Sequence, residues 1–585
     1  MRSLFRIVSQ EERVKTKGKE VVAVTEVRST FLSIGLIVLL GFVVYSNSIN
    51  GEFIWDDHIL IKENNYIKDP SNLYRIFTED IGSGSGRRYG YYRPLYILTF
   101  AMNYSLGGLN VQSYHLTNIV LHILVALCVY WLVTTIFGDR LLSLLTGILF
   151  VVHPVSTEVV TYISGRDNSL VALFMLLCFV SYILLLHVER RSLYTVMIVS
   201  CILALLSREN ALILLPLLLA YHYTFSRKVK IKALAVIGGI LSVYILGVMS
   251  LLSSSILKSG LLDTSWFSTV FQRIPGFFVA ITNYSKLMLL PFDLHVEYGD
   301  RLFNFSDLKA ILGAIILCSS IFYALRKRSS NKLVSFSVFW FFIAILPSSN
   351  IYPINNYMAE RYLYLPSIGF FLILAKLLSF IYREKKLRAF GMILIVFLSV
   401  FYSSLTIKQN GYWREPVSLY RRTLKYTPDS TRAYNNLGSA YAEMGRYEEA
   451  IAAYEKLLEI SPNDPRAYYN LGNVYTELGK FEKAIISYKR AKELNSDFAG
   501  VYYGLGNVYK IMGKNREAID SYRKSIEINP TYAEAHNNLA IVYYYEGEYD
   551  LAVKHCYRAI ELGYKVHPGF LELLKPYRKQ EKLRL

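Results

Sequence analysis

The chain is 585 residues long, 53% of its residues are hydrophobic, and its formal net charge is +19. Its apolar residues concentrate before about residue 408, in runs that approach the roughly 20 residues needed to span a bilayer. The later part of the chain is amphipathic and charged. This distribution excludes a wholly water-soluble protein and predicts two modules, one in lipid and one in water.

The excess of positive charge lies mainly in short loops between the apolar runs. Such a distribution is typical of cytoplasmic loops of membrane proteins, so we expect no nucleic-acid partner. The five cysteines show neither the spacing of a disulfide framework nor that of a zinc site. The basic loops contain Arg190 and Arg191, residues 227–232, residues 326–332 and residues 383–388.

The charge pattern predicts an N-terminal cytoplasmic tail, residues 1–29, followed by about eleven membrane crossings in a domain covering 30–410. Residues 268–292 contain Arg273 and Pro275, and we expect them to lie in the interface or to re-enter rather than cross. An odd number of crossings leaves the C-terminal module extracytoplasmic. The predicted crossings are 31–48, 116–137, 141–153, 168–187, 193–206, 210–225, 233–252, 308–325, 334–349, 361–381 and 389–407.

Residues 411–567 contain a repeat. Gly438, Gly472, Gly506 and Ala540 are each 34 residues apart, which is the period of tetratricopeptide helix pairs. Leu precedes and Tyr follows each of these small residues at constant spacing. We therefore predict an all-α protein, a polytopic helical bundle followed by an α-solenoid, with residues 568–585 as a polar C-terminal tail.

Asparagines recur on the first helix of each predicted repeat. Side-chain amides there would hold the backbone of an extended acceptor peptide in the concave groove. Alternatively, they are solvated residues of the helix surface that bind nothing. The predicted acceptor-binding residues are Asn436, Asn470, Asn473, Asn507 and Asn538.

Two adjacent acids, Asp56 and Asp57, follow the first predicted crossing in the segment F-I-W-D-D-H. Charges near lipid are costly unless they have a partner or a task. One carboxylate would act as general base on an acceptor hydroxyl while the other orients a substrate. The alternative is a loop turn with two solvated acids.

Further polar residues lie on the same predicted face. Arginine suits a lipid phosphate because the guanidinium stays charged and binds oxyanions in a bidentate manner. Each residue singly is also compatible with a satisfied interior polar group, but together they predict group transfer from a membrane-anchored phosphate donor. Arg93, Arg166 and Arg361 are the candidate phosphate ligands, and the supporting residues are His58, His115, His153, Glu158 and Glu360.

The order of these motifs resembles the transmembrane and tetratricopeptide-repeat-containing (TMTC) family. They are W-D-D, Y-R-P-L, Y-H-L-T-N-I-V-L-H, H-P-V-S-T-E, G-R-D and A-E-R-Y-L-Y-L-P-S, followed by the repeats. The resemblance implies a GT-C glycosyltransferase related to protein O-mannosyltransferases, using a polyprenyl-phosphate sugar with inversion. It implies Asp56 as general base, with Asp57 at a position where relatives often have Glu.

The resemblance thus predicts transfer of mannose or another hexose to a protein Ser or Thr hydroxyl. The predicted common side of the repeats and Asp56 indicates that the repeats present this acceptor. We predict no metal or other cofactor, although Asp57 and His58 could bind a cation. Transfer to a lipid or glycan, a non-enzymatic scaffold and a transporter are the alternatives. The chain would be a multi-pass protein of a prokaryotic plasma membrane or, in a eukaryote, of the endoplasmic reticulum.

Overall fold

A computed structural model describes residues 17–256, 266–299, 302–350 and 356–577. In these ranges the regular structure is helical, with no strand. The chain divides into two compact units, Met1–Leu419 and Tyr420–Leu585. The predicted all-α class is therefore confirmed, while the predicted boundary after residue 410 stays a prediction. Residues 1–16 and 578–585, which belong to the predicted tails, lie outside the described residues, as do residues 351–355.

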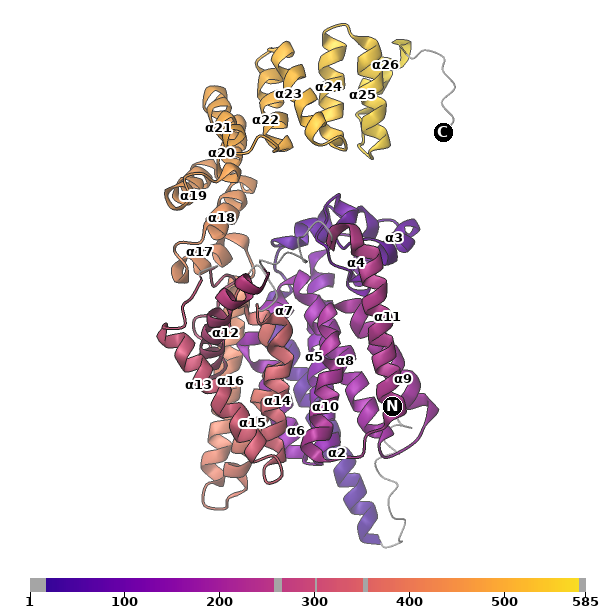
Figure 1. Cartoon of the computed structure of the whole chain (residues 1–585), viewed down its shortest axis with the longest axis vertical. Coiled ribbons are helices and arrows are strands. Elements are labelled where there is room, and N and C mark those ends of the chain that lie inside the picture. The colour runs from indigo at the N-terminus through magenta and orange to yellow at the C-terminus, as the bar shows by residue number, and fades with distance from the viewer. Residues whose placement is uncertain (1–16, 257–265, 300–301, 351–355, 578–585) are drawn as a thin grey trace. The chain divides into compact units, whose positions relative to one another are not determined.

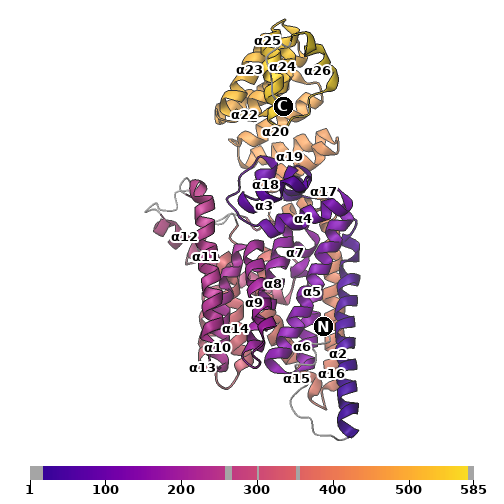
Figure 2. The same ribbon diagram turned by 90° about the vertical axis from the view of Figure 1, so that its right-hand side faces the viewer.

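The first unit is a bundle of long helices that run roughly side by side (Figures 1 and 2). Most helices coincide with an apolar run of the sequence. Their bounds are α2 Lys17–Tyr45, α3 Leu73–Thr78, α4 Pro94–Gly107, α5 Val111–Phe137, α6 Arg140–Val152, α7 Thr157–Thr161, α8 Arg166–Leu185, α9 Arg191–Ser207, α10 Leu214–Phe225, α11 Ile231–Ile256, α12 Trp266–Leu289, α13 Leu308–Arg326, α14 Lys332–Ile345, α15 Ser367–Arg383, α16 Arg388–Tyr412 and α17 Pro416–Tyr426.

Among the described residues, six helices are long and apolar enough to cross a membrane, or seven if the bent pair of α6 with Pro154–Thr161 is one span. That pair bends by 53° where Pro154 follows His153. The helices α9 and Lys332–Ser348 are apolar but shorter. The segment expected not to cross forms α12, a helix with Pro275 inside it. The count of eleven crossings stays a prediction.

Contacts between loops agree with the charge pattern. Loops predicted to be cytoplasmic contact one another through Arg383 with Asp139 at 2.6 Å and Lys230 with Glu189 at 3.4 Å. Close to the opposite ends of α2 and α16, Asn47 donates to the carbonyl of Ile407 at 2.8 Å. Loops of one predicted side therefore lie together, although which end faces the cytoplasm stays a prediction.

The core of the bundle centres on α8, whose most apolar window is 83% buried, whereas that of the peripheral helix α11 is 11% buried. Glycine permits the closest helix contacts. A Cβ at Gly369 of α15 would lie 2.4 Å from the carbonyl oxygen of Ser337 in α14. These backbones approach each other only because that position has no side chain.

The second unit consists of helix pairs of nearly constant length. A Cβ at Gly438, Gly472 or Gly506 would lie 2.5–2.6 Å from the tyrosine ring of the paired helix, so the small residues permit close pairing. The short helix α26 packs its Leu574 against the last repeat. The helices are α18 Thr431–Glu443, α19 Tyr447–Ile460, α20 Pro465–Glu477, α21 Phe481–Leu494, α22 Ala499–Ile511, α23 Asn515–Ile528, α24 Ala533–Tyr545, α25 Tyr549–Glu561 and α26 Pro568–Leu574.

Candidate active site

The loop between α2 and α4, which contains the two adjacent acids, is folded. Its Phe53, Leu60 and Ile61 pack with Tyr96 of α4 and Tyr114 of α5 in one apolar cluster. Further along the loop, the carboxylate of Asp80 accepts hydrogen bonds from the backbone N–H groups of Gly82, Tyr89 and Tyr91 at 2.8–3.0 Å. The loop is therefore a fixed platform rather than a solvated turn.

Asp57 points into this platform and is 1% exposed. Its Oδ2 accepts the backbone N–H of Ile54 at 2.9 Å. Its Oδ1 accepts the backbone N–H of Ser164 at 2.9 Å and also the Ser164 hydroxyl. Burial raises the pKa of Asp57 to about 7, against the effect of these hydrogen bonds. Asp57 thus ties the first loop to the segment before α8.

Asp56 is differently placed, because its side chain is only partly buried. Its backbone N–H donates to the hydroxyl of Tyr162 at 3.2 Å. The preceding Trp55 has φ of +60°, a left-handed conformation that is costly for a bulky residue and that often occurs at functional sites. The ring of Tyr162 lies 6.1 Å from that of Trp55 and stacks at 5.5 Å on the buried Trp413.

Arg361 is bound by the same segment of the chain. Burial, Asp56 and Asp57 raise the pKa of Tyr162, whereas Arg361 lowers it. The buried Glu158 accepts from both the backbone N–H and Nη1 of Arg361. Nε and Nη2 of Arg361 have no hydrogen-bond partner in the part of the chain that the structure describes, and the side chain is 21% exposed. Arg361 therefore presents an open edge to an oxyanion.

The other two predicted phosphate ligands are engaged by the protein. Arg166 is completely buried, and its nitrogens bind Asn118, Asn103, Thr99 and the carbonyl of Tyr114. These bonds cross-link α4, α5 and α8. Arg166 therefore stabilises the packing of these helices, and its burial does not favour the predicted role in donor binding.

Arg93 binds two carboxylates. Its Nε and Nη2 donate to Glu209 at 2.9 and 2.5 Å, and its Nη1 donates to Asp167 at 2.8 Å. Arg208 also binds Asp167, at 3.1 Å. The sequence reasoning above missed Arg208 and Glu209, which follow α9 as a charged pair between two apolar runs. That placement could have identified them, because ionisable residues at such positions are rare without a task.

The supporting residues have mainly structural contacts. His153 faces the carbonyl of Met288 at 3.2 Å, and His58 faces that of Phe53 at 3.0 Å. His115 is buried against Gly51. Glu360 accepts from the hydroxyl of Tyr298 at 2.9 Å. No group of three or more His, Cys, Asp or Glu among the described residues is arranged to hold a metal ion.

The candidate acceptor-binding asparagines lie on the first helices of the repeats and bind neighbouring side chains. Oδ1 of Asn473 accepts from Tyr488, and Oδ1 of Asn507 accepts from Tyr522, both at 2.7 Å. Amides also bridge neighbouring repeats: Asn470 donates to Asn435 at 2.9 Å, Asn538 donates to Asn507 at 2.9 Å, and within α18 Asn435 donates to Asn436 at 3.4 Å. The tyrosines thereby fix which way the amides point.

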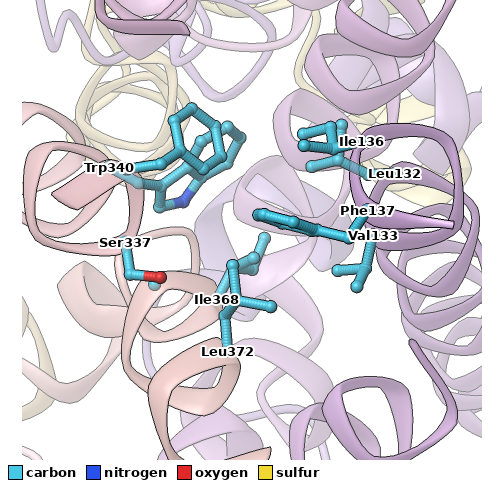
Figure 3. Close-up of a pocket in the computed structure, with 10 residues that line it drawn as sticks. Leu132, Val133, Ile136, Phe137, Ser337, Trp340, Ile368 and Leu372 are labelled. Carbon is cyan, nitrogen blue, oxygen red and sulfur yellow. The ribbon is translucent and has the colours of Figure 1, made fainter. Parts of the chain in front are cut away.

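A separate pocket lies between α5, α14 and α15 (Figure 3). Trp340 and Phe137 approach it from opposite sides, with Ile368 and Leu372 below. It shares no residue with the acidic loop or the arginine contacts. Its lining is Leu132, Val133, Ile136, Phe137, Phe336, Ser337, Trp340, Ile368, Gly369 and Leu372.

The fold and these contacts define a polytopic membrane protein with a folded acidic loop and a helical repeat unit. The family described as "TPR repeat" matches residues 438–479, 472–513 and 506–547, and the one described as "Tetratricopeptide repeat" matches 419–452 and 533–562. The predicted tetratricopeptide array is therefore confirmed. A solved structure of MamA is 32% identical, covers 25% of this chain and 85% of its own, and has a TM-score of 0.23.

Curated relatives extend the match into the membrane unit. "Protein O-mannosyl-transferase F38B6.6" of Caenorhabditis elegans is 28% identical, over 70% of this chain and 60% of its own length. Human "Protein O-mannosyl-transferase TMTC4" is 28% identical over 69% and 63%, and human TMTC3 is 24% identical over 70% and 49%. The chain thus spans half to two thirds of these relatives. The matches confirm the resemblance to the TMTC family.

Proposed function

We propose that this chain transfers mannose or another hexose from a polyprenyl-phosphate donor to a Ser or Thr hydroxyl of a protein, on the extracytoplasmic face. The names of the curated relatives support an O-mannosyltransferase. The observation that carries the proposal is that one segment, residues 157–165, holds both groups: Tyr162 accepts from the backbone N–H of Asp56, and Glu158 accepts from Arg361. Such a transfer needs a base and an oxyanion ligand in one region, and this segment supplies that link.

In this mechanism Asp56 is the general base. The acceptor hydroxyl gives its proton to the Asp56 carboxylate while its oxygen forms a bond to the anomeric carbon. The bond from that carbon to the donor phosphate oxygen breaks, and its electron pair leaves with polyprenyl phosphate. Attack from the face opposite the phosphate inverts the anomeric centre.

Arg361 would stabilise the negative charge that develops on the departing phosphate. Glu158 holds this guanidinium through Nη1 and so fixes the direction of its open edge. Asp57 is a positioning residue, because its three hydrogen bonds hold the loop from which Asp56 projects. Phosphate is already a competent leaving group, so we propose that no metal or other cofactor is required.

The repeats would present the acceptor. Tyr488 donates to Oδ1 of Asn473, so Nδ2 of this amide would bind a peptide carbonyl. In the next repeat, Asn507 accepts from both Tyr522 and Asn538. Repeated amide donors at a constant period recognise the backbone of an extended chain rather than its side chains. The charge pattern supports a common extracytoplasmic side for these repeats and for Asp56.

The test is transfer from polyprenyl-phosphate mannose to a Ser/Thr-containing peptide by the purified full chain. Asp56→Asn should lower the rate by about a hundredfold or more. Glu63→Gln is the matched control, because Glu63 is an acid of the same loop whose side chain is half exposed in a surface ion pair. We expect it to leave the rate unchanged.

Equal transfer by wild type and Asp56→Asn would contradict the role of Asp56. Turnover of the donor with transfer only to an added lipid or glycan would favour that acceptor class instead. No turnover of several polyprenyl-phosphate hexoses, together with peptide capture by the repeats, would favour a scaffold.

A further inference from the structure

The guanidinium of Arg208 is held in place on one side only. Its Nη1 donates to Oδ2 of Asp167 at 3.1 Å and to Oδ1 of Asn168 at 2.6 Å, both in the first turn of α8. Its Nε is buried and has no hydrogen-bond partner in the described chain, and the residue is only 9% exposed. A buried donor of a charged group is rarely left unpaired, so such an atom calls for a ligand.

The arginines of this face can be sorted by their engaged nitrogens. Every guanidinium nitrogen of Arg93 and of Arg166 donates to a protein oxygen. Arg361 and Arg208 each use Nη1 and leave Nε and Nη2, the edge that binds an oxyanion with two parallel hydrogen bonds. Arg361 is assigned to the donor in the proposed function, which leaves the Arg208 edge without a task.

Three arginines and two acids lie close together around Arg208. Arg93 and Arg208 are balanced by Asp167 and Glu209, which they contact. The neighbouring Arg166 is buried among amide, hydroxyl and carbonyl groups and has no carboxylate among its hydrogen-bond partners. The five side chains carry a net charge of +1, and the nearby Asp57, which also acts on Arg166, balances that charge when it is ionised. The case for an anion therefore rests on the open edge of Arg208 and not on an excess of charge.

The surroundings indicate where such an anion comes from. Arg208 directly follows α9, and α9 contacts the poorly buried α11. Both helices expose large apolar side chains in a unit that crosses a membrane, so an alkyl chain can lie against them beside the arginine. These side chains include Val196, Val199, Ile202, Val243 and Leu246.

We propose that the Nε–Nη2 edge of Arg208 binds the phosphoryl oxygens of a membrane lipid, at a site separate from the Arg361 edge. The phosphodiester of a phospholipid and that of a polyprenyl-phosphate sugar share the required chemistry, a single negative charge with two free oxygens. The site does not depend on the proposed sugar transfer.

Native mass spectrometry of the detergent-purified full chain tests this proposal. The probes are phosphatidylglycerol, polyprenyl-phosphate mannose, a polyprenyl alcohol without phosphate, and inorganic phosphate. The variants are Arg208→Gln, Arg208→Lys and, as matched control, Arg190→Gln, which alters an exposed arginine before the opposite end of α9. All are compared in an Asp56→Asn background, so that binding is measured without turnover.

We expect wild type to bind one of the two phosphoryl lipids, and the polyprenyl alcohol not to displace it. Whichever of phosphatidylglycerol and polyprenyl-phosphate mannose binds identifies the kind of lipid that the site takes. Arg208→Gln should weaken its binding about tenfold or more, and Arg190→Gln should not change it. Arg208→Lys keeps the charge but lacks the planar edge, so its affinity for the lipid should lie between those of wild type and Arg208→Gln. This variant tests the proposal if Arg208→Gln does not fold. Equal binding by wild type and either Arg208 variant would overturn the proposal. So would binding of inorganic phosphate alone.

Discussion

The two adjacent acids of the first loop should differ in what their replacement does. Asp57→Asn is isosteric, and its amide oxygen can still accept from Ser164. Its amide nitrogen would then face the backbone N–H of Ile54, which loses the 2.9 Å bond it now makes. One buried donor without a partner costs about 1–3 kcal/mol. Asp56→Asn should cost less, because Asp57 is almost fully buried and joins two segments of the chain, whereas Asp56 is only partly buried.

The effect of Asp57→Asn should also depend on pH. The folded pKa of Asp57 is raised, to about 7. Its stabilising contribution is therefore fully present below the unfolded value of about 4 and is lost as the pH rises through 7. The upper bound of this loss is about 4 kcal/mol, at about 1.4 kcal/mol per pH unit. Asn does not titrate, so the advantage of wild type over Asp57→Asn should be largest at low pH and should fall, as the pH rises through 7, to the contribution of the hydrogen bond to Ile54 alone.

Hydrogen exchange read by mass spectrometry, on peptides covering residues 53–66 and 158–168, measures this loop directly between pH 5 and 8. The observable is the difference in opening free energy between wild type and each variant, corrected for the intrinsic pH dependence of exchange. Parallel wild-type and Asp57→Asn curves would refute the account of Asp57. A shift for Asp56→Asn as large as that for Asp57→Asn would refute the division of tasks.

Three further perturbations follow from the contacts described above. Glu158→Gln removes the charge that holds Arg361, so we expect the free energy of unfolding, measured by thermal unfolding, to fall by about 1–3 kcal/mol and the KM for the donor to rise. An unchanged KM would contradict the role of Arg361 in donor binding. Gly369→Ala places a Cβ 2.4 Å from a carbonyl of α14 and should cost about 1–3 kcal/mol in the same assay, whereas Gly35→Ala, with nothing within 4 Å, should not. Burial and the facing His536 lower the pKa of His555 to about 4, so stability present above pH 6.5 should fall as the pH drops towards 4, by on the order of 1 kcal/mol after allowance for solvent screening. His555→Gln should remove that dependence in hydrogen exchange of α24 and α25, and an unchanged dependence would exclude the histidine pair as its cause.

The repeat unit could be predicted almost completely because its periodicity is local. Gly438, Gly472 and Gly506 recur at one spacing, and each meets a tyrosine sixteen residues later in the paired helix. Helix pairs fold on their nearest neighbours, so sequence spacing is enough to specify them.

The site was predictable by residue type but not by role. The sequence does not distinguish the three arginines, but their burial and hydrogen-bond partners do. Arg93 binds two carboxylates, Arg166 is buried among uncharged groups, and Arg361 keeps two nitrogens free of protein partners in the described chain. Those partners are Glu209, Asn103 and Glu158, all remote in the chain. Tertiary contacts decide which arginine is available, and a single sequence does not contain them. The different directions of Asp56 and Asp57 depend on Ser164 for the same reason.

The common sidedness of the acidic loop and the repeats is the claim on which acceptor presentation depends. Single cysteines at three exposed positions, Arg88→Cys, Lys385→Cys and Lys489→Cys, would be placed in a variant lacking the five native cysteines. Labelling with a membrane-impermeant maleimide is then compared in sealed, outside-out membranes before and after permeabilisation. We predict that Arg88→Cys and Lys489→Cys label before permeabilisation and Lys385→Cys only afterwards. Labelling of Lys489→Cys together with Lys385→Cys, and apart from Arg88→Cys, would contradict the account.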